Sequence, residues 1–144
     1  MLNHGFIKEK IDLIGQELAY LEKFSQHSME EIVGNFTLQA AFERFLERIV
    51  IRAVDINEHI IEELAEATMK SPKSYKETFF SLTKLNILSD ELVKALIKSV
   101  DTRNALTHDY DEFKLSSVYS SVKECLEDYS KYCDNILKFL DKQK

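Results

Sequence analysis

Residues 103–110 read RNALTHDY and place an arginine, a histidine and a tyrosine in one short stretch. An arginine guanidinium binds phosphate oxygens through a planar fork of N–H donors and stabilises negative charge that develops on them. A histidine can take or give a proton near neutral pH. Arg103 and His108 together therefore suit cleavage of a phosphodiester, with a ribose 2′-hydroxyl as the nucleophile and no metal ion.

The spacing of these residues also permits a simpler interpretation. Five helical steps separate Arg103 from His108, about 140° of rotation and about 7.5 Å of rise, so they would not share a helix face. A helix end near His108 and the reach of arginine relax this constraint, and Tyr110 would return to the face of Arg103 if the helix continued. The alternative is a surface arginine and a histidine that caps a helix carboxyl end, which favours cations.

The composition is typical of one soluble all-α domain covering residues 1–144. Hydrophobic residues make up 44% and charged residues 31%, and one proline and three glycines offer few interruptions. No long stretch alternates apolar and polar residues, so strands are not expected. The net charge of −6 argues against tight non-specific nucleic-acid binding, though not against a local basic cleft. Without a membrane-length apolar run or a signal peptide, we expect a cytoplasmic protein without a membrane partner.

Apolar residues spaced by three and four positions predict five helical segments, and the turns between them are short. Ser74 with Glu77 forms a capping-box pattern, and Ser89 is a second cap candidate. Long amphipathic helices with short connectors predict an antiparallel bundle of four to five helices, and leftover apolar surface favours a two-fold homodimer. The predicted helices cover residues 6–29, 37–68, 75–85, 89–108 and 115–140, with a turn at 30–36 and the polar connector DYDEFK after His108.

The RNALTHDY segment fits the R-x4-H-x-Y signature of HepT-like toxins in the HEPN superfamily, and Asn104 matches the polar residue that commonly follows the motif arginine. The similarity extends to longer segments. FTLQAAFERFLERIVIRAVDINEHII resembles the family's long second helix, and SPKSYKETFFSLTKLNILSDEL resembles its turn and short third helix. The resemblance covers about residues 36–140.

This resemblance implies a HEPN-like homodimer whose paired motifs face a shared cleft, where RNA is cut without a metal or another cofactor. Arg103 would hold the scissile phosphate and His108 would move protons, with Asn104 in support. The protein would then be a metal-independent endoribonuclease, the toxin of a type II-like or type VII toxin–antitoxin system. An MntA-like nucleotidyltransferase antitoxin would silence it by adenylylating Tyr110, because a bulky anion there would block the cleft and repel RNA.

An arginine stripe and an Asp–His pair lie on the segment 37–68. Arg44, Arg48 and Arg52 recur every four residues, which suits either an RNA track or ion pairs with acids such as Glu43 and Glu47 on a solvated face.

Asp55 and His59 are also four residues apart, on one face of the same predicted helix. Asp55 could support the site by orienting a catalytic group. A buried, hydrogen-bonded structural pair explains the same spacing, because buried polar groups need partners whatever their function.

A second function class stays open beside the ribonuclease. HEPN-like bundles also serve as non-catalytic nucleotide- or substrate-binding subunits of nucleotidyltransferases, and in that case the Arg–His pair would bind a nucleotide phosphate. The complete motif, Tyr110 included, favours the ribonuclease over this alternative and over a purely structural dimer. No convergent ligand set is visible, so no metal site is expected, and Cys125 and Cys133 are expected to be reduced thiols.

Overall fold

The computed structural model describes residues 1–66, 68–108 and 118–143, with the side chain of His108 outside the described part. Within these ranges the regular structure is entirely helical, which confirms the all-α prediction. The elements are α1 (His4–Leu21), the 3-10 helix η1 (Glu22–Phe24), α2 (Met29–Val33), α3 (Phe36–Leu64), α4 (Tyr75–Lys84), α5 (Asp90–His108) and α6 (Val122–Lys142).

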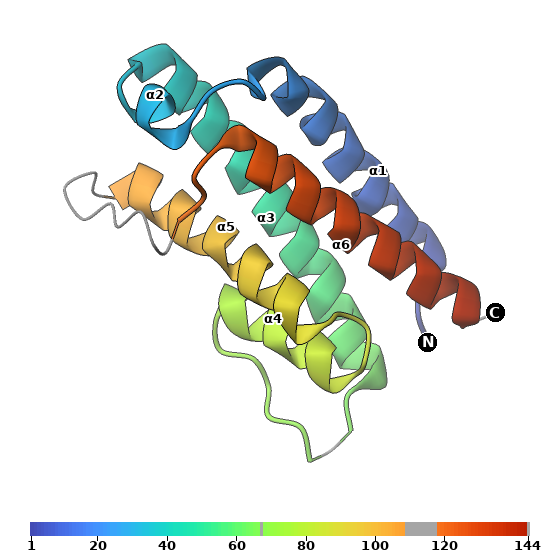
Figure 1. Cartoon of the computed structure of the whole chain (residues 1–144). Helices are drawn as coiled ribbons and strands as arrows, with labels where there is room; N and C mark the ends of the chain where they lie inside the picture. Colours follow the sequence, from blue (N-terminus) through green and yellow to red (C-terminus); the bar gives the residue numbers. More distant parts are fainter. Residues whose placement is uncertain (67, 109–117, 144) are drawn as a thin grey trace.

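The long helices α1, α3, α5 and α6 form a bundle in which successive members run in opposite directions (Figure 1). The short helix α4 packs against α3 and α5. This arrangement places the carboxyl end of α5, which carries the motif, at the same end of the bundle as α2 and the start of α3. The two chain termini lie together at the opposite end (Figure 1).

A continuous apolar core fills the bundle, and the hydroxyls of Tyr129 and Tyr132 inside it are hydrogen-bonded. Tyr132 of α6 donates to Asn57 Oδ1 of α3 at 2.6 Å and to the Ala53 carbonyl at 3.1 Å. Asn57 Nδ2 in turn donates to Thr78 Oγ1 of α4 at 3.1 Å. Because buried polar groups are costly when unpaired, this chain fixes α6, α3 and α4 in one register.

The first predicted helix, 6–29, is too long by several residues. The helix ends at Leu21, and α2 then begins at Met29, inside the region predicted as helix end and turn. Ser28 caps α2, with its hydroxyl accepting a hydrogen bond from the Glu31 N–H at 3.2 Å. The Met29 N–H donates to the Ser120 carbonyl at 2.8 Å, a contact with a distant segment that local patterning could not reveal.

Two other predicted boundaries also differ from the structure. The helix predicted over 37–68 ends at Leu64, where Ala65 has extended backbone angles. The helix predicted from residue 115 starts at Val122, because Ser121 is its N-cap and residues 118–121 are not helical. Residues 115–117 lie outside the described part.

The caps predicted for α4 and α5 are confirmed. Ser74 Oγ accepts from the Glu77 N–H at 3.2 Å, and Ser89 Oγ accepts from the Leu92 N–H at 3.1 Å. The Glu77 carboxylate reaches back to the Lys73 N–H, one residue before the cap. Side-chain caps therefore fix the starting points of α4 and of α5, the helix that carries the motif.

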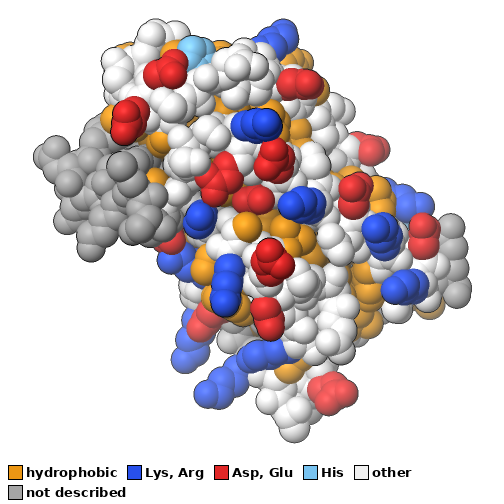
Figure 2. Space-filling view, viewed as in Figure 1, with side chains coloured by type: hydrophobic (Ala, Val, Ile, Leu, Met, Phe, Trp, Pro, Cys, Tyr) orange, Lys and Arg blue, Asp and Glu red, His pale blue; other side chains and the backbone are white. Residues whose placement is uncertain are grey.

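Charged side chains of both signs are interspersed over the face of α5 and α6 (Figure 2). This mixed surface agrees with the small acidic net charge of the sequence. None of the helices in the described ranges has the length and hydropathy needed to cross a lipid bilayer.

Candidate active site

Arg103 lies near the carboxyl end of α5 and points its guanidinium at α4. The Arg103 Cζ is 5.8 Å from the centroid of the Tyr75 ring. Its Nη1 donates to the neighbouring Asn104 Oδ1 at 3.4 Å. The Nε is buried and has no hydrogen-bond partner among the described residues. Since a guanidinium carries five N–H donors, this arginine keeps donors free for an anionic ligand.

His108 is the last residue of α5 that the structure describes. The backbone between Arg103 and His108 is regular helix, so the two positions are separated by about 140° of rotation around α5. The His108 side chain and Tyr110 lie outside the described residues, as does the predicted connector DYDEFK. Within one chain, the helix geometry does not direct the two motif residues to one face.

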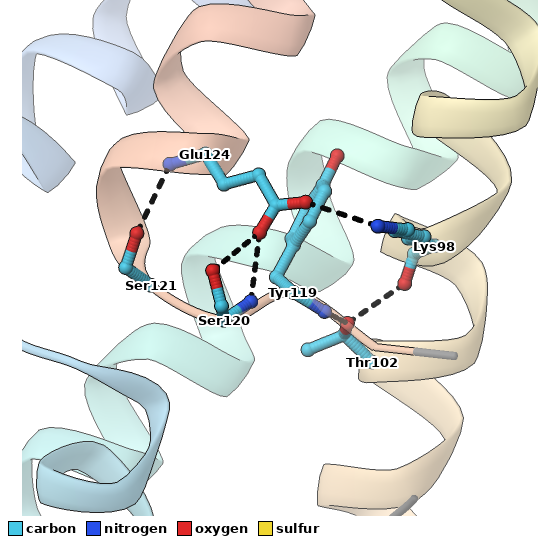
Figure 3. Close-up of polar contacts among 6 residues, drawn as sticks. All are labelled: Lys98, Thr102, Tyr119, Ser120, Ser121 and Glu124. Carbon is cyan, nitrogen blue, oxygen red and sulfur yellow. Dashed lines mark hydrogen bonds and ion pairs between the residues drawn. The ribbon is translucent and has the colours of Figure 1, made fainter. Parts of the chain in front are cut away.

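Tyr119, which follows the motif in the sequence, is hydrogen-bonded to α5 at Thr102 (Figure 3). The Tyr119 N–H donates to Thr102 Oγ1 at 2.8 Å, and that hydroxyl donates to the Lys98 carbonyl at 2.7 Å. Thr102 and Tyr119 are both fully buried. Tyr119 is thus fixed to the last turns of α5 through Thr102.

A second set of contacts in Figure 3 joins α5 to the start of α6. Glu124 Oε2 accepts from the Ser120 N–H and hydroxyl, both at 2.8 Å, and Lys98 Nζ donates to Glu124 Oε1 at 3.4 Å. Burial alone would raise the pKa of Glu124, but these hydrogen bonds and the Lys98 charge hold that pKa below its ordinary value. The carboxylate is therefore ionised near neutral pH and stabilises the entry into α6.

The carboxyl end of α5 is also attached to α3. Thr107 Oγ1 donates to Glu43 Oε1 at 3.3 Å, and Gln39 Nε2 donates to Glu43 Oε2 at 3.2 Å. Glu43, expected as a partner of the arginine stripe, instead contacts the motif helix. This contact fixes the turn of α5 that immediately precedes His108.

The arginine stripe of α3 is engaged in ion pairs, as one of its two interpretations predicted. Arg44 lies 3.8 Å from Glu47 on the same helix. Arg48 and Arg52 instead reach Glu17 of α1, with N–O distances of 3.5 and 2.8 Å. Glu17 is buried, and its Oε2 has no partner in the described part of the chain. Two of the three arginines therefore hold α1 against α3.

Asp55 and His59 both face α1 and do not pair with each other in the structure, so the predicted Asp–His pair is wrong. Asp55 Oδ2 lies 3.1 Å from Lys10 Nζ, and its side chain is 38% exposed. His59 Nε2 accepts from the Asn3 N–H at 2.9 Å, and its ring lies 5.3 Å from that of Phe6. Asp55 has its partner on α1, and His59 has its partner at the N-cap of that helix. These contacts do not support a role for Asp55 beside Arg103.

Asp128 of α6 is a buried carboxylate that the sequence analysis missed. It is only 8% exposed, and its Oδ2 lacks a hydrogen-bond partner among the described residues. Burial, assisted by the charge of Glu124, raises its pKa to about 6. The sequence did carry a sign of this burial, because an acid stands here on an apolar helix face. Asp128 comes three residues after the buried Cys125 and one before the buried Tyr129.

The cysteines are free thiols, as predicted, with Cys125 buried and Cys133 partly buried. Burial raises the pKa of Cys133 to about 12, so this thiol is unreactive at neutral pH. Over the described ranges, no three histidine, cysteine or acidic side chains converge as metal ligands would.

Comparisons with known proteins agree on one family. The family described as "Ribonuclease HepT-like" matches residues 14–136. The tRNA nuclease HepT of Aphanizomenon flos-aquae is 36% identical over 136 residues, which cover 93% of this chain and 89% of the relative. The mRNA nuclease HepT of Shewanella oneidensis is 32% identical over 102 residues, covering 71% and 74%.

A solved structure has the same fold. It is the tri-AMPylated HEPN toxin of Shewanella oneidensis in complex with its MNT antitoxin. The superposition has a TM-score of 0.76 at 28% identity and covers 95% of this chain and 99% of the toxin. The helical bundle is therefore shared with a HEPN toxin.

Proposed function

This chain belongs to the HepT-like ribonuclease family, and we propose that it is the toxin of a toxin–antitoxin pair that cuts RNA with Arg103 and His108. The observation that carries the proposal is the Arg103 guanidinium, at the motif position, with a buried Nε that no described residue satisfies. A buried donor of this kind is costly to leave unpaired, and an RNA phosphate supplies the missing acceptor.

The reaction follows from these two side chains. Arg103 binds non-bridging oxygens of the scissile phosphate and stabilises the charge that builds up on them. A neutral His108 takes the proton from the ribose 2′-hydroxyl, whose oxygen then attacks phosphorus. The bond to the 5′-oxygen breaks and that oxygen gains a proton, leaving a 2′,3′-cyclic phosphate and a 5′-hydroxyl. No step in this sequence requires a metal ion.

A two-fold homodimer resolves the geometry of the motif. Five helical steps, about 140° of rotation, separate Arg103 from His108, so helix geometry alone does not place the two positions on one face of one copy. Two copies facing a shared cleft supply two arginines and two histidines. One His108 then acts as the base and the other as the acid.

Control by a nucleotidyltransferase partner completes the proposal. The similar solved toxin is tri-AMPylated and bound to an MNT antitoxin. By that likeness, an MntA-like antitoxin adenylylates Tyr110 of this chain in the cytoplasm. Each added AMP brings negative charge beside Arg103 and competes with the RNA phosphate for the guanidinium.

The decisive experiment incubates purified protein, with Tyr110 shown by mass spectrometry to be bare, with total RNA in excess EDTA. An Arg103→Ala/His108→Ala double variant is the control. We expect cleavage by the wild type only, and total RNA is the right substrate because the two relatives are named for different RNA classes. Nucleotide binding without cleavage would instead identify a non-catalytic subunit of a nucleotidyltransferase.

A further inference from the structure

The first turn of α4 lies against the motif helix, next to Arg103. We propose that this turn is part of the ribonuclease site, with Tyr75 positioning the Arg103 guanidinium and Lys76 neutralising Asp101. The inference rests on the proposed function and adds two positioning residues to it. Neither residue belongs to the R-x4-H-x-Y motif, and both come from a helix that precedes it in the chain.

The contact between Tyr75 and Arg103 restricts the guanidinium without consuming its donors. The Arg103 Cζ lies 5.8 Å from the Tyr75 ring centroid, within the range of a cation–π interaction. A guanidinium that rests on a ring keeps its N–H edge free, and that edge is the part that binds a phosphate. Tyr75 is 37% exposed, so the ring borders solvent where RNA would approach.

Tyr75 is itself held by the core. Its carbonyl accepts from Thr78 Oγ1 at 2.7 Å, and Thr78 Oγ1 accepts from Asn57 Nδ2 at 3.1 Å. Asn57 in turn accepts from the buried Tyr132 hydroxyl at 2.6 Å. This hydrogen-bonded chain ties the backbone of Tyr75 to α3 and α6, so the ring is a fixed support for a long, flexible arginine side chain.

Lys76 forms an ion pair with Asp101, an acidic residue close to Arg103 in the sequence. Asp101 lies two residues before Arg103 on α5, and its carboxylate would repel an RNA phosphate at that arginine. Lys76 Nζ is 2.5 Å from Asp101 Oδ1, with side-chain exposures of 39% and 28%. The ion pair leaves the positive charge of Arg103 uncompensated where a phosphate would bind.

The test of Tyr75 compares Tyr75→Phe, which keeps the ring, with Tyr75→Leu, which does not. Initial rates are measured on an RNA oligonucleotide that the wild type cuts. We expect Tyr75→Leu to lower kcat about 3- to 30-fold with a smaller change in KM, since a cation–π contact contributes about 0.5–2 kcal/mol. We expect Tyr75→Phe to keep at least half of the rate. A wild-type kcat for folded Tyr75→Leu, or an equal loss in both variants, would overturn the role of the ring.

Tyr20, which lies on α1 and not on α4 or α5, provides a matched control. It is 54% exposed, and Lys23 Nζ lies 5.9 Å from its ring centroid, so it has the same kind of contact away from the motif. Tyr20→Leu should leave kcat at the wild-type value. An equal loss in Tyr20→Leu and Tyr75→Leu would mean that both act through stability alone and would overturn the inference.

The role of Lys76 is tested by rescue. Lys76→Gln exposes the Asp101 charge and should lower kcat/KM about two- to fivefold, an effect of the size expected for one part-exposed charge pair. Adding Asp101→Asn removes that charge and should restore at least half of the wild-type value. A double variant as slow as Lys76→Gln would mean that Lys76 contacts RNA itself, and a wild-type rate for Lys76→Gln would mean no role. Either result would overturn the assignment.

The Arg103→Ala/His108→Ala variant separates this inference from the proposed function. If that variant cuts RNA as the wild type does, the proposed catalytic pair is wrong whatever the α4 variants do. If it is inactive while Tyr75→Leu and Lys76→Gln both match the wild type, the catalytic pair stands and only the role of α4 fails.

Discussion

The Thr102 hydroxyl accepts a hydrogen bond from the Tyr119 backbone N–H at 2.8 Å, one residue before Arg103. This bond attaches Tyr119 to the motif helix. Thr102→Val keeps the shape but leaves a buried N–H unpaired, and we expect it to lower the free energy of unfolding by about 1–3 kcal/mol. Urea unfolding measures the change. Thr102→Ser, which keeps the hydroxyl, should lose clearly less, and equal stability of Thr102→Val and wild type would contradict the prediction.

Asp128 makes the stability of the protein depend on pH. Its pKa is about 6 in the folded state, above the ordinary value of 3.8, so ionisation is less favourable in the folded chain. The free energy of unfolding should therefore fall as pH rises from about 4 to about 6 and above. Asp128→Asn removes this titration and should stabilise the protein at pH 8 by at most ~3 kcal/mol, with no gain at pH 4.

Thermal or urea unfolding of Asp128→Asn and wild type across this pH range gives the result. Asp134→Asn, on the same helix, is a suitable control for the loss of one acidic charge. A stabilisation by Asp128→Asn that is independent of pH would show that burial of the carboxylate is not the cause.

Glu17 and the arginine stripe give a prediction with an internal control. Arg52→Met removes the nearer partner of a buried carboxylate and should destabilise the protein by about 1–3 kcal/mol, because a buried charge loses its closest counter-ion. Arg44→Met removes a pair that is 3.8 Å apart, with Arg44 61% exposed, and should change stability by less than about 0.5 kcal/mol. Differential scanning calorimetry compares the two.

The same two variants test the alternative role of the stripe. If the stripe only holds α1 and α3 together, Arg44→Met should cut RNA at the wild-type rate. A several-fold rise in KM for Arg44→Met, with unchanged folding, would instead support the RNA track.

Tyr110 is the predicted point of control. Coexpression with an MntA-like nucleotidyltransferase should add AMP to Tyr110 and abolish RNA cleavage, because the added negative charge repels RNA phosphates. Tyr110→Phe should remain active after the same treatment. Peptide mass spectrometry locates the modification, and an inactive protein with a bare Tyr110 would show that binding alone accounts for inhibition.

The long helices were predictable from sequence because each has a strong apolar period, and the caps at Ser74 and Ser89 were predictable because they are local chemistry. The errors occur where contacts between residues far apart in the sequence determine the structure. Local patterning extended the first helix to Met29, whereas the Met29 N–H pairs with Ser120 far along the chain. An i,i+4 spacing suggested an Asp55–His59 pair, whereas α1 offers Lys10 and the Asn3 backbone to these side chains instead.

At the site, the sequence identified the motif residues but not the contact of Tyr75 with Arg103. Arg103 and His108 were predicted as the catalytic pair from one octapeptide. Tyr75 did not, because an aromatic residue after a cap carries no sign that it will face an arginine on the next helix. The contact depends on the antiparallel packing of α4 and α5, which is a property of the tertiary structure.

Because α6 follows the motif in the sequence, the order of synthesis determines when the contacts that support Arg103 can form. A ribosome releases Arg103 and His108 before it releases α6, yet Tyr119 holds Thr102, and Tyr132 begins the hydrogen-bonded chain that reaches Tyr75. The buried face of α6 also closes the core against α1 and α5. A nascent chain that stops short of α6 carries the motif but not the support of Arg103. The contacts that support Arg103 are therefore complete only after α6 has been synthesised.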